Sequence, residues 1–523
     1  MHSHRLLLSL VALLATPSLA DACGGLFCSG SLPTPVEQSG ERILFEVDRN
    51  TGTVTTTVDI QYGGDPAAFS WLLPIPVSDA MPLPELALAP ETLLRDLELA
   101  TQPTLIRPPQ RCTEPPPPPF AFSQRVTLSA LPDSPEDGVD TTDLPNVGPF
   151  DNELIQATDV DALIDWLREN GYLVSPEMEP ALADYVGEGL AFLGVRLLAD
   201  ADVDEIAPLS VTWPGSEPMI PLRLTSISAE PEMGLLVFIA ADQPYGSSNW
   251  PTMELDLERL QWNPVRQQTN YHGLLSFQID EVGGQGFVVE RAAAPDDLVV
   301  SFRPSAEALT ALLERTDVIT RLHGRAHPEE MLTDPLFGPE ELSFDGTFDL
   351  SGRPAIERCD GAKRNPVPCA ETYCGVGGQC AETDARGEGC VCAAGFVARP
   401  VRRPVRPGVD ETTTVVCQDA AWDFLGELGP AQQDVCAPEA CGPDGECVAV
   451  NGFPTCSCDE GFAAITDGAG FLVCAEATKI YDRDRIATWS ATQCAGCSSS
   501  SDRSASLAGL LLLLGALARR RRP

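Results

Sequence analysis

The segment from Arg42 to Tyr62 reads R-I-L-F-E-V-D-R-N-T-G-T-V-T-T-T-V-D-I-Q-Y, and it indicates the fold class of the first part of the chain. Its two halves, Arg42 to Asp48 and Thr53 to Tyr62, are rich in Val, Ile and Thr and partly alternate between apolar and polar residues. The residues between them favour a turn and end in Gly52. Two such runs joined by a short turn predict a β-hairpin.

Similar runs downstream indicate further strands. The expected strands are Leu209 to Trp213, Leu222 to Ile227, Leu235 to Ala240, Gly286 to Glu290 and Asp297 to Phe302. The glycine-rich stretch Gly283 to Gly286 is expected to form a hairpin turn.

Helices are expected to be fewer. The clearest one spans about residues 160 to 170, with Asp159 as its N-cap and Gly171 at its end. Its apolar residues share one face, at Val160, Leu163, Ile164 and Leu167. A second helix is expected over Ala306 to Arg315. The expected fold class is therefore mainly β (α+β), an antiparallel-sheet N-terminal domain with a few helices, followed by two small disulfide-rich modules.

Length and charge narrow the possible functions. A chain of 523 residues is longer than one core usually supports, so two or more folding units are expected. The 76 acidic and 34 basic residues give a formal charge of -42, which repels nucleic acid and attracts cations or basic surfaces.

The first 22 residues have the pattern of a secretory signal peptide. A basic start at Arg5 precedes an apolar stretch and small residues that suit cleavage after Ala20 or Ala22. Export would place the 18 cysteines in an oxidising compartment, where disulfides are the expected state. Only Cys23, Cys28 and Cys112 precede Cys359, so an N-terminal domain is expected over residues 23–350.

This N-terminal domain resembles a known family. The motifs that carry the resemblance are C-G-G-L-F-C (Cys23 to Cys28), Y-G-G-D-P-A-A-F-S-W-L-L-P-I-P-V (Tyr62 to Val77), D-W-L-R-E-N-G-Y (Asp165 to Tyr172), Thr320-Arg321-Leu322 and Asp334-Pro335. They are similar to the domain of unknown function 2330 family over roughly residues 22–345. The resemblance implies an exported bacterial domain and no particular activity.

A repeated six-cysteine spacing follows, over residues 369–417 and 436–474. Both copies read C-x4-C-x5-C-x8/9-C-x-C before a longer loop to the sixth cysteine, and the pattern resembles EGF-like modules. The resemblance implies the pairs Cys369–Cys380, Cys374–Cys390, Cys392–Cys417, Cys436–Cys447, Cys441–Cys456 and Cys458–Cys474. A zinc cluster is the poorer interpretation, because the spacing lacks C-x2-C knuckles and the region contains no histidine.

Two features of these modules leave room for a further role. Asp434 and Asn451 partly match the calcium ligands of some EGF modules, although a structural spacer without a metal is the leading interpretation. The long last loop of the first module carries Arg399, Arg402, Arg403 and Arg406. This basic loop is interpreted as a solvated insertion.

The chain offers few residues for catalysis. His323 and His327 stand at i and i+4, but H-G-R-A-H lacks the glutamate of a zinc-protease motif, and both are expected to be exposed loop histidines. No nucleophile elbow or phosphate-binding loop is present. No catalytic residue, metal ligand or cofactor is therefore assigned, apart from the calcium candidates.

The C-terminal residues 494–523 form a tripartite tail. Cys494 and Cys497 and a serine-rich spacer precede an apolar stretch from Ala505 to Ala518 and an arginine run. The tail resembles the MYXO-CTERM sorting signal of myxobacteria, which implies processing or lipidation at Cys494 or Cys497. A plain transmembrane helix is the alternative, although the apolar stretch is short for a bilayer.

These features predict an exported protein anchored to the cell surface or outer membrane of a myxobacterium-like bacterium. We expect it to bind an unidentified protein or glycan or to be structural, rather than to be an enzyme. The alternative is an exported hydrolase whose site lies in the N-terminal domain. The remaining upstream cysteines are expected to pair as Cys23–Cys28 and Cys112–Cys359, although other pairings are open.

Overall fold

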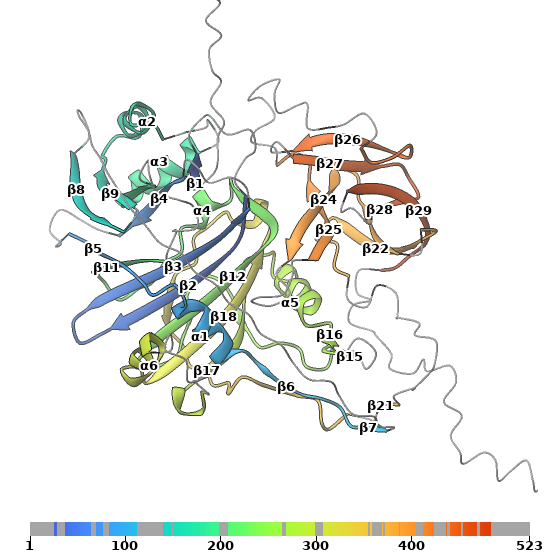
Figure 1. Ribbon diagram of the computed structural model, residues 1–523, viewed down its shortest axis with the longest axis horizontal. Coiled ribbons are helices and arrows are strands. Elements are labelled where there is room, and N and C mark those ends of the chain that lie inside the picture. Colours follow the sequence, from blue (N-terminus) through green and yellow to red (C-terminus); the bar gives the residue numbers. More distant parts are fainter. Residues whose placement is uncertain are drawn as a thin grey trace, which may run out of the picture.

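The computed structural model describes residues 26–482, apart from 29–36, 64–68, 77–82, 112–139, 149, 173, 175, 177, 198–207, 264–267, 299–306, 354–355, 358–368, 370–371, 386, 404–411, 423–435, 437–439, 451–452 and 468–470. The described chain is mainly β-strand with few helices, as the sequence predicted. It consists of an N-terminal domain built on two large sheets and a disulfide-rich region beside it (Figure 1).

The larger sheet of the N-terminal domain has eight strands. In spatial order they are β14 (Thr252–Met253), β17 (Phe287–Ala293), β18 (Val318–Ala326), β12 (Ala229–Ala241), β2 (Glu37–Asp48), β3 (Thr53–Gly63), β11 (Leu209–Pro214) and β5 (Glu85–Leu88). The smaller sheet contains β1 (Leu26–Cys28), β4 (Phe69–Ile75), β10 (Ala191–Leu197), β9 (Phe150–Gln156) and β8 (Asp140–Val147).

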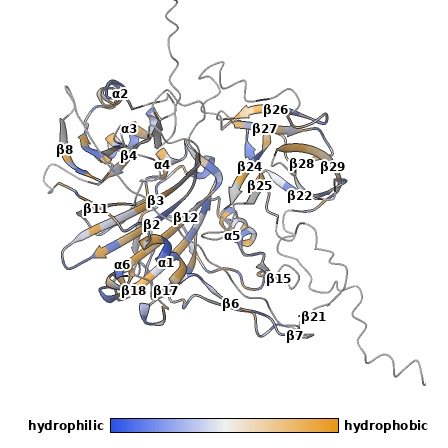
Figure 2. Ribbon diagram, viewed as in Figure 1, coloured by the Kyte–Doolittle hydropathy of each residue, from blue (hydrophilic) through white to orange (hydrophobic). Residues whose placement is uncertain are grey.

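The two sheets pack face to face through a shared core, to which every second residue of a strand can contribute. Trp71 and Leu73 of β4 share one core with Phe45 of β2 and Val237 of β12. The intervening Leu72 of β4 instead joins a core on the outer side of the smaller sheet. Figure 2 shows the corresponding mixture of apolar and polar residues along β2 and β3.

Helices cover the outer faces of both sheets. Helices α2 (Val160–Glu169) and α3 (Glu179–Glu188) pack on the smaller sheet, and α1 (Leu93–Thr101) and α6 (Glu307–Glu314) pack on the larger one. Helix α5 (Tyr271–Asp280) lies against β17 and β18. The layers therefore run helix, sheet, sheet, helix (Figure 1).

Several predicted elements are confirmed. Strands β2 and β3 form the hairpin, with Asp48 opposite Thr53, and β11, β12 and β17 cover three further predicted strands. Helix α2 begins where predicted, and the Asp159 side chain accepts a hydrogen bond of 2.9 Å from the backbone N–H of Ala162. The large sheet is not wholly antiparallel, because β2 and β12 pair in parallel.

The predicted strand from Leu222 to Ile227 is wrong. Its first residues form the one-turn helix α4 (Leu222–Thr225), in which the Ser226 amide donates to the Leu222 carbonyl over 2.9 Å. Pro221 before it is compatible with a helix start, and local side-chain bonds to the backbone favour the turn over an extended strand.

Two other sequence predictions need correction. Residues 283–286 connect α5 to β17 and do not join two strands of a hairpin. The strand predicted from residue 297 begins instead with Asp297 at the end of a 3-10 helix, η2 (Pro295–Asp297), and residues 299–302 lie outside the described part of the chain. Helices α1, α3 and α5 were not predicted.

Short strand pairs and one further 3-10 helix complete this domain. They are β6 (Thr104–Ile106) with β20 (Thr347–Asp349), β7 (Gln110–Arg111) with β21 (Ile356–Glu357), β13 (Tyr245–Ser247) with β19 (Phe337–Pro339), β15 (Trp262–Asn263) with β16 (Gln268–Thr269), and η4 (Pro328–Glu330).

The β7–β21 pair supports a specific disulfide prediction. Glu357 lies opposite Arg111 in a parallel register, so the chain leaves both strands from neighbouring positions toward Cys112 and Cys359. Neither cysteine lies within the described residues. We expect non-reducing peptide mapping to recover one peptide pair that joins Cys112 to Cys359, and recovery of either cysteine in a bridge to Cys23 or Cys28 would contradict this pairing.

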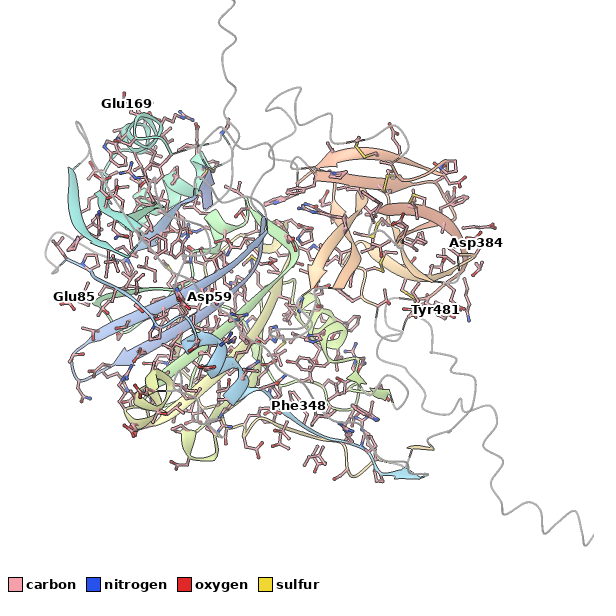
Figure 3. The ribbon with its side chains drawn as sticks, in the orientation of Figure 1. Asp59, Glu85, Glu169, Phe348, Asp384 and Tyr481 are labelled. Atoms are coloured by element: carbon pink, nitrogen blue, oxygen red, sulfur yellow. A yellow bond between two sulfur atoms is a disulfide. The ribbon has the colours of Figure 1, made fainter. Side chains whose placement is uncertain are left out.

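The disulfide-rich region, residues 369–482, is named the cystine unit. Its strands are β22 (Gly378–Thr383), β23 (Glu388–Cys392), β24 (Phe396–Arg403), β25 (Thr412–Asp419), β26 (Gly445–Val450), β27 (Phe453–Cys458), β28 (Phe462–Thr466) and β29 (Leu472–Ile480). Its bridges, drawn in Figure 3, join Cys369–Cys380, Cys374–Cys390, Cys392–Cys417, Cys436–Cys447, Cys441–Cys456 and Cys458–Cys474. These are the same pairs that the resemblance to EGF-like modules implied.

The two cysteine repeats interlock. Strands β22 and β23 of the first repeat form a closed barrel with β28 and β29 of the second, while β24 and β25 join β27 and β26 in a four-stranded sheet. Two of the strand pairings between the repeats involve corresponding residues. Cys390 of β23 pairs with Ala464 of β28, and Cys456 of β27 pairs with Ala398 of β24. Cysteines from both repeats share one core, so the cystine unit is a single packed body.

Several predicted features lie outside the described residues. They are the signal peptide over residues 1–22, the calcium candidates Asp434 and Asn451, the basic residue Arg406, Cys494, Cys497 and the tail over residues 494–523. Within the described ranges, no helix combines the length and apolar character needed to cross a membrane.

Candidate functional site

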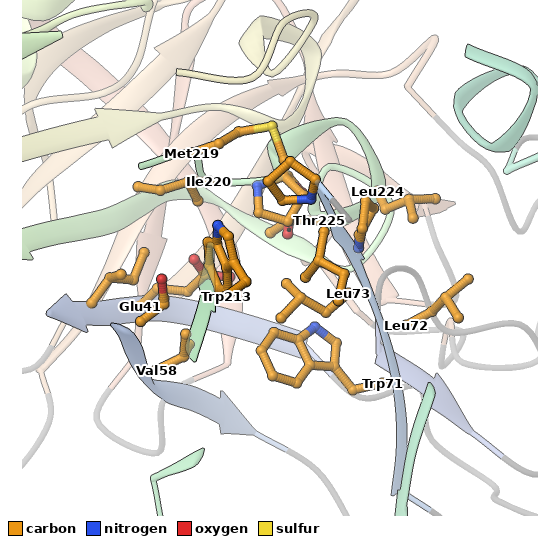
Figure 4. Close-up of a pocket in the computed structure, with 16 residues that line it drawn as sticks. Glu41, Val58, Trp71, Leu72, Leu73, Trp213, Met219, Ile220, Leu224 and Thr225 are labelled. Carbon is orange, nitrogen blue, oxygen red and sulfur yellow. Dashed lines mark hydrogen bonds between the residues drawn. The ribbon is translucent and has the colours of Figure 1, made fainter. Parts of the chain in front are cut away.

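A narrow apolar slot opens between the two sheets of the N-terminal domain (Figure 4). Trp71 of β4 and Trp213 of β11 line it from opposite sheets, and Leu73 lies beside their indole rings. Trp71 and its neighbours belong to the W-L-L-P-I-P motif, so one of the motifs that carry the family resemblance forms one wall. We call this feature the two-tryptophan slot.

Glu41 of β2 is a polar residue in this apolar lining, and its side chain is buried. Burial raises the pKa of its carboxyl to about 7, against the lowering effect of the hydrogen bond from Gln38. The Thr56 hydroxyl and the Trp213 indole N–H are buried in the same lining without a hydrogen-bond partner among the described residues. Unpaired polar atoms in an apolar pocket are typical of ligand sites.

The slot is small. Its free volume of about 20 Å³ has room for the centre of one water-sized group. Met219 and Pro221 are partly exposed and Pro76 is exposed, so these residues form the open side of the slot. The enclosed part of the slot therefore suits a small group.

A cluster around Asp334 holds the rim of the slot in place. The Arg223 side chain donates to Asp334 from Nε over 2.9 Å and from Nη2 over 2.7 Å, and the Tyr185 hydroxyl donates to it over 3.0 Å. Arg223 also makes a two-bond contact with Glu188 of α3. The Asp334-Pro335 motif thus fixes α4, which carries the slot residues Leu224 and Thr225, against α3.

The buried Glu41 carboxyl predicts an unusual pH dependence of stability. Its pKa rises from 4.5 to about 7 on folding, so the folded state holds a proton that the unfolded state releases between these pH values. Stability is therefore lost as the pH rises from about 4.5 to 7. When the pH is raised from 4 to 8, the free energy of unfolding of Glu41→Gln should increase by about 3 kcal/mol relative to that of the native protein. Urea unfolding at both pH values measures this, and a pH-independent difference would contradict it.

A second polar cluster lies on the outer face of the larger sheet, beneath α5. Glu290 of β17 forms an ion pair with Arg321 and accepts hydrogen bonds from His323, over 2.9 Å, and from Tyr271. Burial alone would raise the pKa of Glu290, but the charges of Arg321 and His323 and these hydrogen bonds lower it below its usual range. The Thr320-Arg321-Leu322 motif therefore supplies the partner of a buried carboxylate.

The neighbouring Glu232 of β12 occupies a similar environment. Its carboxylate accepts a hydrogen bond of 2.5 Å from Ser276 and lies 3.3 Å from Nε2 of His327. Burial alone would lower the pKa of His327, but the contact with Glu232 and the charges of Glu329, Glu232 and Glu330 raise it to about 10. A Cβ atom at Gly375 would lie 3.1 Å from the His327 ring, so this cluster touches the cystine unit.

The expectation that His323 and His327 are exposed loop residues is wrong. His323 lies on β18 with 13% of its side chain exposed, and His327 follows that strand with 1% exposed. The pattern R-L-H-G-R is that of a strand whose alternate residues, Arg321, His323 and Arg325, share one face. Within the described ranges, no three His, Cys, Asp or Glu residues are grouped to hold a metal ion.

The solvated-insertion interpretation of the basic loop is wrong for Arg399. This residue lies in β24 with 3% exposed, donates to Gln418 over 3.1 Å and stacks on Phe453. Burial lowers its pKa to about 9.

The glutamates of these sites could not be selected from the sequence. Glu41, Glu232 and Glu290 are three of 76 acidic residues, and their burial follows from sheet packing rather than from a local motif. Glu232 and Glu290 both lie at irregularities in strand register, a signal that the sequence does not display.

Comparisons with known proteins give one positive result. The family model described as "Uncharacterized protein conserved in bacteria (DUF2330)" matches residues 17–334. No curated protein and no solved structure matches the chain.

Proposed function

We propose that the chain, which belongs to the DUF2330 family of proteins conserved in bacteria, is an exported binding protein of the cell surface. In this proposal the N-terminal domain engages a partner, the cystine unit supports it with two EGF-like repeats, and residues 494–523 anchor it to the outer membrane. The proposed partner is a protein or glycan outside the cell.

The core of the cystine unit carries the export proposal. Cystine sulfur fills much of the interior of this unit, alongside a few residues such as Val415 and Leu472. A core so rich in cystine depends on its bridges, and removing one such bridge typically costs about 2 to 5 kcal/mol. Reducing cytoplasm would remove that support, which favours an oxidising compartment outside it.

The two-tryptophan slot supports binding over catalysis. It combines an apolar lining with three buried polar groups, Glu41, Thr56 and Trp213, as binding pockets do. Its size suits the tip of one side chain better than a whole substrate. The buried Glu290 and Glu232 clusters support the same view, because each carboxylate is engaged by several partners of the fold itself.

Surface labelling of intact cells of the native host tests the proposal. We expect a membrane-impermeant biotin reagent to label the protein, and we expect deletion of residues 494–523 to move it into the culture medium. The matched control is a double change of Cys494 and Cys497 to serine, which separates lipidation at those cysteines from anchoring by the apolar stretch. A protein that is labelled only after lysis would contradict the proposal.

A further inference from the structure

We infer that the two-tryptophan slot binds a lysine side chain presented by a partner protein, with Glu41 as its counter-ion and the Trp71 and Trp213 rings as its walls. This inference deepens the proposed binding role. It names the chemistry that the slot recognises.

The first argument comes from the pairing of buried carboxylates. Glu290, Asp334 and Glu232 are each within ion-pair distance of an arginine or histidine of the fold. Glu41 is as deeply buried, with 5% exposed, but its carboxylate accepts a hydrogen bond from the neutral Gln38. No cation of the described residues forms an ion pair with it or lowers its pKa. A carboxylate in this setting gains most from a cation that arrives from outside.

The second argument comes from the walls of the slot. Trp71 and Trp213 place two indole rings in the lining, one above the other in the view of Figure 4. Indole is the aromatic ring that attracts cations most strongly, and the attraction grows when water is excluded. The Thr56 hydroxyl, which has no partner among the described residues, can accept a hydrogen bond from an ammonium group.

Size selects among the possible cations. The space open to the centre of a water-sized group is about 20 Å³, which accommodates a primary ammonium. The planar guanidinium of arginine is larger and carries five donors in a fixed fork, so it demands more space and more acceptors than an ammonium with three donors. The apolar lining beside the indoles suits the methylene chain of lysine.

The surroundings of the slot favour a partner protein over a free amine. Leu336 pairs with Met219 in an isolated bridge beside the open side, and it is 38% exposed. Exposed apolar residues around a buried polar contact are what a protein interface covers. The formal charge of -42 also favours approach of a basic surface.

Calorimetry with small probes on the disulfide-bonded chain tests the inference at 0.15 M salt. The probes are Nα-acetyl-lysine methylamide, its norleucine analogue, which lacks the ammonium, and its arginine analogue. We expect the lysine probe to bind at least tenfold more tightly than either other probe. Because Glu41 is about half protonated near pH 7, binding should release about half a proton, measured in buffers of different ionisation enthalpy. Affinity should fall as the pH drops below 7.

Matched variants separate the slot from the acidic surface. Glu41→Gln keeps the shape of the side chain and should remove both the lysine preference and the proton release. Glu217→Gln removes an exposed carboxylate near Met219 and should change neither. A pentapeptide with leucines on both sides of lysine should bind more tightly than n-butylammonium, and Leu336→Ser should reduce that gain.

Three outcomes would overturn the inference: no lysine binding, equal binding of the norleucine probe, or unchanged lysine binding in Glu41→Gln. Equal binding of the pentapeptide and n-butylammonium would overturn its assignment to a partner protein. None of these results bears on surface labelling of cells, so failure of this inference and failure of the proposed function can be told apart.

Discussion

Neither cysteine repeat of the cystine unit should fold when it is produced without the other. A chain that ends at residue 422 lacks β28 and β29, which close the barrel with β22 and β23, and it lacks the cysteines that complete the shared core. We expect that chain to give mixed disulfides on oxidative refolding. Residues 436–482 alone should behave in the same way, because β27 loses its partner β24.

Non-reducing peptide mapping measures this result. The control is the complete unit, residues 369–482, which should recover its six native bridges under the same conditions. If residues 436–482 alone form their three native bridges and give a dispersed NMR spectrum, the repeats fold independently and the interlocked core is not required.

Removal of Arg321 should strongly destabilise the N-terminal domain. Arg321 is 6% exposed and Glu290 is 1% exposed, so Arg321→Met leaves a buried carboxylate without its main counter-charge. Breaking a buried pair from one side typically costs about 3 to 5 kcal/mol. We expect a loss of this size in the free energy of unfolding at pH 7, measured by urea denaturation.

Two controls separate the ion pair from other effects of the substitution. The Arg49–Asp242 pair is about half exposed, with 48% and 50% of the side chains accessible, so Arg49→Met should change stability by less than about 1 kcal/mol. Adding Glu290→Gln to Arg321→Met removes the stranded charge and should restore part of the loss. A double variant that is less stable than Arg321→Met would show that Glu290 stabilises the fold through its other partners.

The sequence predicts those parts of the fold whose signal is local. The β2–β3 hairpin and helix α2 follow from residue periodicity, a short turn and the Asp159 cap. The six bridges match a spacing that recurs twice. Helix α4 escapes prediction because Leu222 and Leu224 alternate like strand residues, whereas contacts of Arg223 with the distant Asp334 hold the turn.

The candidate site is harder to predict, because it depends on contacts between distant segments. The W-L-L-P-I-P motif carries the family resemblance, but it does not indicate the facing Trp213, which comes from another sheet far along the chain. Glu41 belongs to a hairpin whose sequence shows only the usual alternation of apolar and polar residues. Its burial results from the packing of the two sheets. The interlocking of the repeats is equally invisible in cysteine spacing.

The path of the chain through the cystine unit determines how far it can hold the N-terminal domain from an anchor. Strand β22 near the entry pairs with β29 at the exit, where Ala381 lies opposite Ile480, and the Tyr481 amide donates to the Cys380 carbonyl over 2.9 Å. The chain therefore enters and leaves the cystine unit at adjacent positions. A pulling force between the N-terminal domain and the C-terminal tail would act across the neighbouring strands β22 and β29. In the proposed anchored protein, the unit would therefore add much less reach than two repeats laid end to end.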